Sequence, residues 1–181
     1  MTITLSGTSG INTPGVVNTA AQTVATTLAV TGVSTLTGGF TVGATAAPAF
    51  SATSSAGTTL ANVTYVKVTF DTESFDTNSN FASSRFTPTV AGYYQINSNI
   101  VYLATVTVTQ VVLAIYKNGT VINYINTNNP TNTNSIAISS IISMNGSTDY
   151  IEIFCYMAGT GTLSSQGGSQ TTFNGAMIRS A

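Results

Sequence analysis

The chain has 181 residues, of which 5% are charged, with no histidine, four Lys or Arg, five Asp or Glu and a formal net charge of -1. Proteins usually carry charge on about a quarter of their residues, and a nucleic-acid-binding surface needs a basic stripe that four scattered cations do not form. No apolar run approaches the roughly 18 residues of a membrane-spanning helix. Composition therefore argues against nucleic-acid and membrane partners.

Residues 1–47 form the first predicted region, an extended N-terminal arm. It has no charged residue, and Phe40 is its one aromatic residue. Its short apolar pairs, set between Gly and Thr, are too few for a core of its own. We expect the arm to dock on copies of itself or on a larger partner, with Ile3, Leu5 and Ile11 as anchoring residues, while a disordered linker is the alternative. The opening residues show no secretory signal, so assembly in a cytoplasm is expected.

Residues 48–181 are predicted to form one all-β head domain. No ten-residue stretch has apolar residues at helical spacing, and the Thr, Val, Ile, Gly and Asn content favours strands and turns. Long loops are expected at Asp71–Phe81 and Ala158–Ser169. The predicted strands are Pro48–Ala52, Val63–Phe70, Arg85–Thr87, Tyr93–Leu103, Gln110–Lys117, Val121–Ile125, Ile136–Met144, Tyr150–Met157 and Thr171–Ile178.

Two of these strands differ in whether one or both of their sides are apolar. In Tyr93–Leu103 an apolar side alternates with a polar one, which predicts a half-buried strand. In Gln110–Lys117 both sides are apolar, and Asn118-Gly119 then predicts a tight hairpin turn. A second apolar side needs another sheet, a helix or another subunit to cover it. Because no helix is predicted, we expect a subunit interface. The residues assigned to it are Tyr94, Val112, Ala114 and Tyr116.

No residue set predicts catalysis, and we expect neither an enzyme nor a cofactor. Cys155 falls on the apolar side of its strand and is expected to be a buried packing residue, since no histidine could activate it. Asp149 and Glu152 point to opposite faces by parity, which excludes a glycosidase pair. The one acidic cluster could offer oxygens to calcium, but no Gly provides the sharp turn of a dedicated calcium loop, so a solvated loop is the preferred interpretation. That cluster is Asp71, Glu73 and Asp76.

Eight or nine strands with Asn-Gly turns suggest a jelly-roll β-sandwich. The order of several motifs extends this: Pro48-Ala-Phe-Ser-Ala, Val68-Thr-Phe-Asp, Phe86-Thr-Pro-Thr-Val-Ala-Gly-Tyr-Tyr-Gln-Ile, Ile115-Tyr-Lys-Asn-Gly, Met144-Asn-Gly-Ser-Thr-Asp-Tyr-Ile-Glu-Ile and Thr172-Phe-Asn-Gly-Ala-Met-Ile. Over about 48–179 the chain resembles the globular head of complement component 1q and its tumour-necrosis-factor-like relatives. The resemblance implies a ten-stranded jelly roll that assembles as a homotrimer.

The arm resembles the Thr/Gly-rich stretches of bacteriophage fibres and other virion surface proteins, at residues 3–11 and 27–43. The collagen-like stalk of the animal complement relatives is missing, so their functions are not expected here. We expect a homotrimeric structural protein on a phage virion surface. Its role would be capsid decoration, with the arm held by the major capsid protein. The alternative is a short fibre whose head binds a host glycan through the two long loops, and a secreted bacterial adhesin is disfavoured.

Overall fold

The structure, a computed structural model, describes residues 47–102, 107–128, 134–161 and 163–181. All regular elements within these ranges are strands, and no helix there is long and apolar enough to cross a membrane. The strands are β1 Ala49–Ser54, β2 Thr59–Leu60, β3 Thr64–Lys67, β4 Thr72–Asp76, β5 Phe81–Ala82, β6 Arg85–Phe86, β7 Gly92–Tyr102, β8 Val108–Lys117, β9 Thr120–Asn128, β10 Asn134–Met144, β11 Ile151–Gly159, β12 Leu163–Ser164 and β13 Gly168–Ser180.

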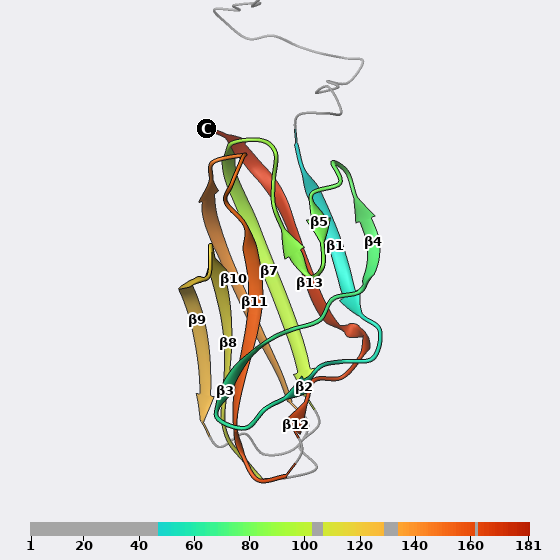
Figure 1. Ribbon diagram of the computed structural model, residues 1–181, viewed down its shortest axis with the longest axis vertical. Coiled ribbons are helices and arrows are strands. Elements are labelled where there is room, and N and C mark those ends of the chain that lie inside the picture. Colours follow the sequence, from blue (N-terminus) through green and yellow to red (C-terminus); the bar gives the residue numbers. More distant parts are fainter. Residues whose placement is uncertain (1–46, 103–106, 129–133, 162) are drawn as a thin grey trace, which may run out of the picture. The chain divides into compact units, whose positions relative to one another are not determined.

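The strands form two antiparallel five-stranded sheets packed as a sandwich (Figure 1). Sheet I has the order β10-β7-β13-β1-β4, and sheet II has the order β5-β6-β11-β8-β9. Strands β12 and β2 form a separate small ribbon. Strand β3 runs beside β11, where the Val63 amide donates to the Met157 carbonyl at 2.8 Å and the Val68 amide donates to Ile153 at 2.9 Å. The predicted all-β jelly-roll sandwich is confirmed.

The core lies between the two sheets and follows from the alternation of side chains along each strand. In β7 the predicted apolar side, from Tyr94 to Tyr102, is buried, and the side that begins with Tyr93 is not. The aromatic centre of the core is Phe50, which stacks on Phe81 and Phe86 with ring centroids 4.9 and 4.4 Å apart and meets the edge of another buried ring. Such rings each bury about 150–250 Å², so they supply much of the driving force for folding.

The two Asn-Gly sequences form turns in different ways. Asn118 and Gly119 have φ of 53° and 78°, as the predicted β8–β9 hairpin requires. Asn145 instead uses its side-chain oxygen to accept the backbone amides of residues 147, 148 and 149, which builds the crossing from sheet I to sheet II. Gly146 follows with φ of 70°, where an added Cβ would collide with the backbone of Ala91. Side-chain capping and a glycine thus fix this crossing.

Both predicted long loops contain strands. Asp71–Phe81 includes β4, which pairs with β1 at the edge of sheet I. The Asp71 carboxylate fixes this edge by accepting the Ser55 amide and hydroxyl, each at 2.6 Å. Because β4 is largely exposed, it has no alternating pattern for sequence analysis to detect. Ala158–Ser169 holds the end of β11 and all of β12, and the predicted strand Val63–Phe70 is regular only in β3.

Candidate functional site

The outer face of sheet I, which points away from sheet II, is covered by neutral hydrogen-bonded side chains. Gln95 donates to the Ser139 hydroxyl at 2.7 Å, that hydroxyl donates to Asn97 at 2.9 Å, and Asn97 donates to Asn174 at 3.1 Å. Strands β10, β7, β13 and β1 contain no Asp or Glu, and their one cation is Arg179. Apart from the edge strand β4, which carries Glu73 and Asp76, this sheet therefore presents neutral polar groups and a single cation.

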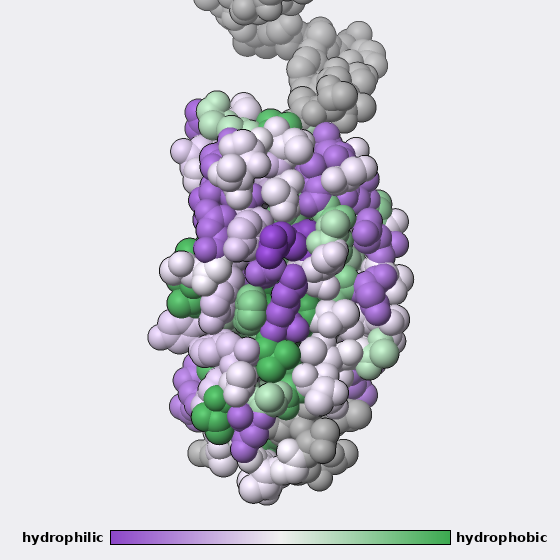
Figure 2. All heavy atoms as spheres, viewed as in Figure 1, coloured by the Kyte–Doolittle hydropathy of each residue, from purple (hydrophilic) through white to green (hydrophobic). Residues whose placement is uncertain are grey.

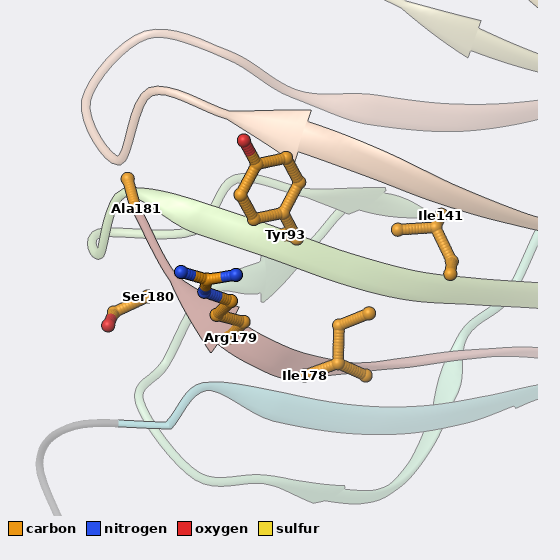
Figure 3. Close-up of a pocket in the computed structure, with 6 residues that line it drawn as sticks. All are labelled: Tyr93, Ile141, Ile178, Arg179, Ser180 and Ala181. Carbon is orange, nitrogen blue, oxygen red and sulfur yellow. The ribbon is translucent and has the colours of Figure 1, made fainter.

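The same face becomes apolar at the end where the chain terminates. Tyr93, Ile141 and Ile178 are 44%, 60% and 53% exposed and come from β7, β10 and β13. Together with Arg179 and the last two residues they line a hollow of about 380 Å³. Figure 3 shows Tyr93 between Ile141 on one side and Arg179 and Ile178 on the other. Three large apolar side chains so close together at one end of a mostly polar face mark a contact surface.

The outer side of β8 and β11 in sheet II is covered from within the chain, whereas the edge strand β9 leaves Val121 and Tyr124 exposed by 44% and 63%. Tyr65 on β3 lies over the sheet, with its ring centroid 5.2 Å from that of Tyr156 and 6.1 Å from that of Tyr116. Tyr116 in turn lies 4.2 Å from Phe154. Partial burial, together with the neighbouring tyrosines, raises the pKa of Tyr65 above its ordinary value. The second apolar side of β8 thus has aromatic cover from its own chain.

The four residues assigned to a trimer interface lie in two places. Tyr94 is fully buried in the core, where its hydroxyl donates to the Val90 carbonyl at 2.7 Å and burial raises its pKa to about 12. Val112 and Ala114 are 4% and 0% exposed on the outer side of sheet II, and Tyr116 belongs to the aromatic cover. Tyr94, Val112 and Ala114 therefore have almost no surface to offer a second chain. Tyr116 is half-buried and lies opposite Val121 of β9, which is 44% exposed, so of the four it keeps the most surface.

Ion pairs gather on sheet II. Glu152 is almost fully buried, and its Oε1 accepts from Lys67 at 2.7 Å and from Arg85 at 2.9 Å. Burial alone raises the pKa of Glu152, but these two hydrogen bonds outweigh it and leave that pKa below its ordinary value. Asp149 pairs with Lys117 at 2.8 Å, and that hydrogen bond lowers its pKa. The two carboxylates have separate cationic partners, as structural ion pairs do.

The remaining candidate residues are not brought into a reactive arrangement. No group of three acidic, Cys or His side chains that could hold a metal ion occurs in the described part of the chain. Asp71 is engaged by Ser55, whose hydrogen bonds lower its pKa. Cys155 is a free thiol, and its complete burial raises its pKa to about 12, which confirms the packing role. The arm residues Ile3, Leu5 and Ile11 lie outside the described residues.

The sequence analysis did not predict the exposed Ile141 or the ion-pair cluster around Glu152, for different reasons. Ile141 could have been found, because alternation in Ile136–Met144 places it among serines on the polar side of the strand. The cluster of Glu152 with Lys67 and Arg85 had no such signal, since its cations are 85 and 67 positions away in sequence. Only the register of β6 against β11 brings Arg85 opposite Glu152.

Comparisons with known proteins find similarity in structure alone, since no protein-family model and no curated protein matches. The globular domain of zebrafish complement 1qA protein is similar with a TM-score of 0.53 and 19% identity, covering 74% of this chain and 98% of that one. Murine APRIL at pH 5.0 is similar with a TM-score of 0.57 and 11% identity, covering 73% and 99%. Eiger TNF from S. frugiperda gives 0.56 and 10%, covering 75% and 94%. The head therefore has the jelly-roll fold of the complement 1q and TNF proteins.

Proposed function

We propose that this chain is a homotrimeric structural protein of a virion surface, without enzymatic activity, and that three heads associate through the outer face of sheet I. The observation that carries the trimer is the apolar end of this face, where Tyr93, Ile141 and Ile178 are exposed together. Heads of the complement 1q and TNF fold commonly form homotrimers, which supports the same assembly here.

Charge on this face also favours self-association. Identical copies repel one another where they bring like charges together, and four of the five strands of sheet I offer Arg179 as their one charged residue. The amide and hydroxyl groups of Gln95, Asn97 and Ser139 can exchange hydrogen bonds with a neighbouring copy. A stable interface of this kind should bury more than about 1,200 Å². Much of the sheet would have to take part.

The oligomeric state is measured by light scattering of the full chain after size exclusion at micromolar concentration. We expect three times the chain mass of 18.6 kDa. A single-chain mass at that concentration would exclude the trimer.

We further propose capsid decoration as the role, with residues 1–47 as an anchoring arm that binds the major capsid protein. Support comes from the composition of the arm, which has no charge and too little apolar surface to fold alone. A ligand stabilises the state that it binds. Particles assembled without this chain should therefore lose resistance to heat and to low ionic strength while adsorbing normally to host cells.

The arm is tested separately with a chain that begins at Pro48. This head should still form trimers and unfold in one transition, because the core of the sandwich draws on residues from Phe50 onward. It should no longer bind the particle, since the anchoring contacts are gone. Loss of folding in the shortened chain would show instead that the arm is part of the head.

A short fibre that binds a host glycan is the second candidate. The observation that favours it is a polar cleft beside β6, which contains two of the four cations of the chain. Particles that lack a receptor-binding fibre should keep their stability and lose adsorption, which is the opposite of the result expected for decoration.

A further inference from the structure

We propose that a cleft beside β6 binds the carboxylate of an acidic saccharide, with Arg85 as the recognising side chain. The cleft has a volume of about 590 Å³ and lies where β3 and the β5–β6 hairpin meet. The lining residues that matter are Lys67, Ser79, Ala82, Ser83, Arg85 and Thr87. This is the cleft that favours the glycan-binding alternative, and the inference adds the class of ligand and the residue that recognises it.

The charges in the cleft favour an anion. Lys67 and Arg85 both bond one oxygen of Glu152, so two cations face a single buried carboxylate and leave one positive charge in excess. This excess stands out in a chain whose net charge is -1. The Lys67 ammonium also donates to the Ser83 carbonyl at 2.8 Å, which uses a second of its three N–H groups. Arg85 is therefore the freer of the two cations.

Arg85 is held in place with its outer edge open. Its Nε donates to Glu152 at 2.9 Å, and its guanidinium carbon lies 3.9 Å from the centre of the Tyr150 ring. The bond and the stacking fix the plane of the guanidinium. Its terminal nitrogens make no hydrogen bond to any other described residue, and the side chain is 44% exposed. A fixed guanidinium fork is suited to a carboxylate and loses little entropy on binding.

Hydroxyl groups around Arg85 favour a saccharide as the rest of the ligand. The side chains of Ser79, Ser83 and Thr87 line the cleft and make no hydrogen bonds within the described ranges. Each hydroxyl can both donate and accept, as can each sugar hydroxyl. The smallest lining side chain is Ala82, and no large apolar residue is present to hold a lipid chain or an aromatic ring.

The cleft is independent of trimer formation. All of its lining residues come from one chain, and none lies on β10, β7, β13 or β1. The inference rests on the glycan-binding alternative and not on capsid decoration, and it remains testable if the chain is a monomer. In a trimer built on sheet I, each head would keep its own cleft.

The test compares ligands that differ in charge alone. The full chain is titrated with a linear trimer of galacturonic acid and with the neutral galactose trimer, using calorimetry and backbone NMR shifts. The acidic trimer should bind at least about tenfold more tightly, with shifts centred on residues 79–87, and its affinity should fall as salt is raised.

The decisive variant places a negative charge in the cleft. Ala82 is exposed and stands opposite Arg85 in the β5–β6 register, so Ala82→Glu would present a tethered carboxylate to the guanidinium. Binding of the acidic trimer should fall at least about tenfold. Ala61→Glu makes the same change at an exposed alanine outside the cleft and should alter affinity less than about twofold. Thermal melting of both variants shows that they fold.

Other results would overturn the proposal. Equal binding of the neutral trimer would exclude recognition by charge. An equal loss of affinity in Ala61→Glu would show that the net charge of the protein, and not the cleft, causes the effect. Inorganic phosphate or a short glutamate peptide that binds as tightly as the acidic trimer would exclude a saccharide site. Absence of binding by the acidic trimer at millimolar concentration would exclude the site altogether.

Discussion

The two sheets differ in the side chains that cover their outer faces. Sheet II covers the outer side of β8 and β11 with Tyr65 and the rings around it, and it holds all three ion pairs of the described residues. Sheet I covers its outer face with an amide and hydroxyl network and leaves Ile141 and Ile178 exposed. In Figure 2, hydrophobic residues (green) on the visible face are scattered among weakly polar (white) and hydrophilic (purple) ones. The cover of sheet II stops short of its edge strand β9, where Val121 and Tyr124 stay exposed, so each sheet keeps apolar surface in one place.

The largest effect on stability is expected from a substitution in the core between the two sheets. Phe50→Ala removes a ring that stacks on Phe81 and Phe86 and is 1% exposed. It should lower the free energy of unfolding by about 3–5 kcal/mol. Chemical denaturation measures this loss. Because both sheets share the core, trimer formation should weaken along with stability, and a variant that lost stability but associated normally would separate association from the fold.

Association through sheet I is tested by a single charge at its apolar end. Ile141→Lys brings like charges together in a trimer and should weaken association about a hundredfold or more, with little change in the stability of one head. Val63→Lys, at another highly exposed apolar residue just before β3 and outside sheet I, is the matched control. Sedimentation velocity compares the two. Equal association of both variants would remove sheet I from the interface.

The internal cover of sheet II is tested with Tyr65→Ala. The change removes ring contacts to Tyr156 and Tyr116 and should cost about 1–2 kcal/mol of unfolding free energy. Trimer mass should not change, because the proposed association uses sheet I. Tyr93→Ala on sheet I should give the reverse pattern, with weaker association and nearly unchanged stability. Identical behaviour of the two variants would contradict the contrast between the sheets.

The ion pairs of sheet II predict a smaller, pH-dependent effect. The folded pKa of Glu152 is below the ordinary value of 4.5, so its stabilisation is present above that pH and is lost as pH falls through the folded pKa. Glu152→Gln should therefore lower the melting temperature at pH 7 and show a flatter loss of stability below about pH 4.5. Melting curves from pH 7 to 3 measure this. Parallel curves for the two proteins would assign the acid response to other carboxylates, such as Asp149.

Several features were predictable from sequence because they depend on neighbours along the chain. The buried side of β7 follows from strict alternation, and the β8–β9 hairpin follows from Asn118-Gly119. Strand β4 was not predictable, because an exposed edge strand lacks alternation. Apolar content on both sides of β8 was correctly read as a need for cover, but composition has no information on whether that cover comes from the same chain or another.

By itself, the sequence determined an all-β head whose strands bury one regular side, since local dihedral preferences and hydrophobic periodicity act over a few residues. Tertiary structure alone decided that Tyr65 covers sheet II, that Arg85 meets Glu152, and that Ile141 and Ile178 share one exposed end of sheet I. Those pairs are distant in sequence, and the order and register of strands bring them together. Strand register depends on the packing of the whole sandwich, because a shift of one residue would turn each side chain to the opposite face.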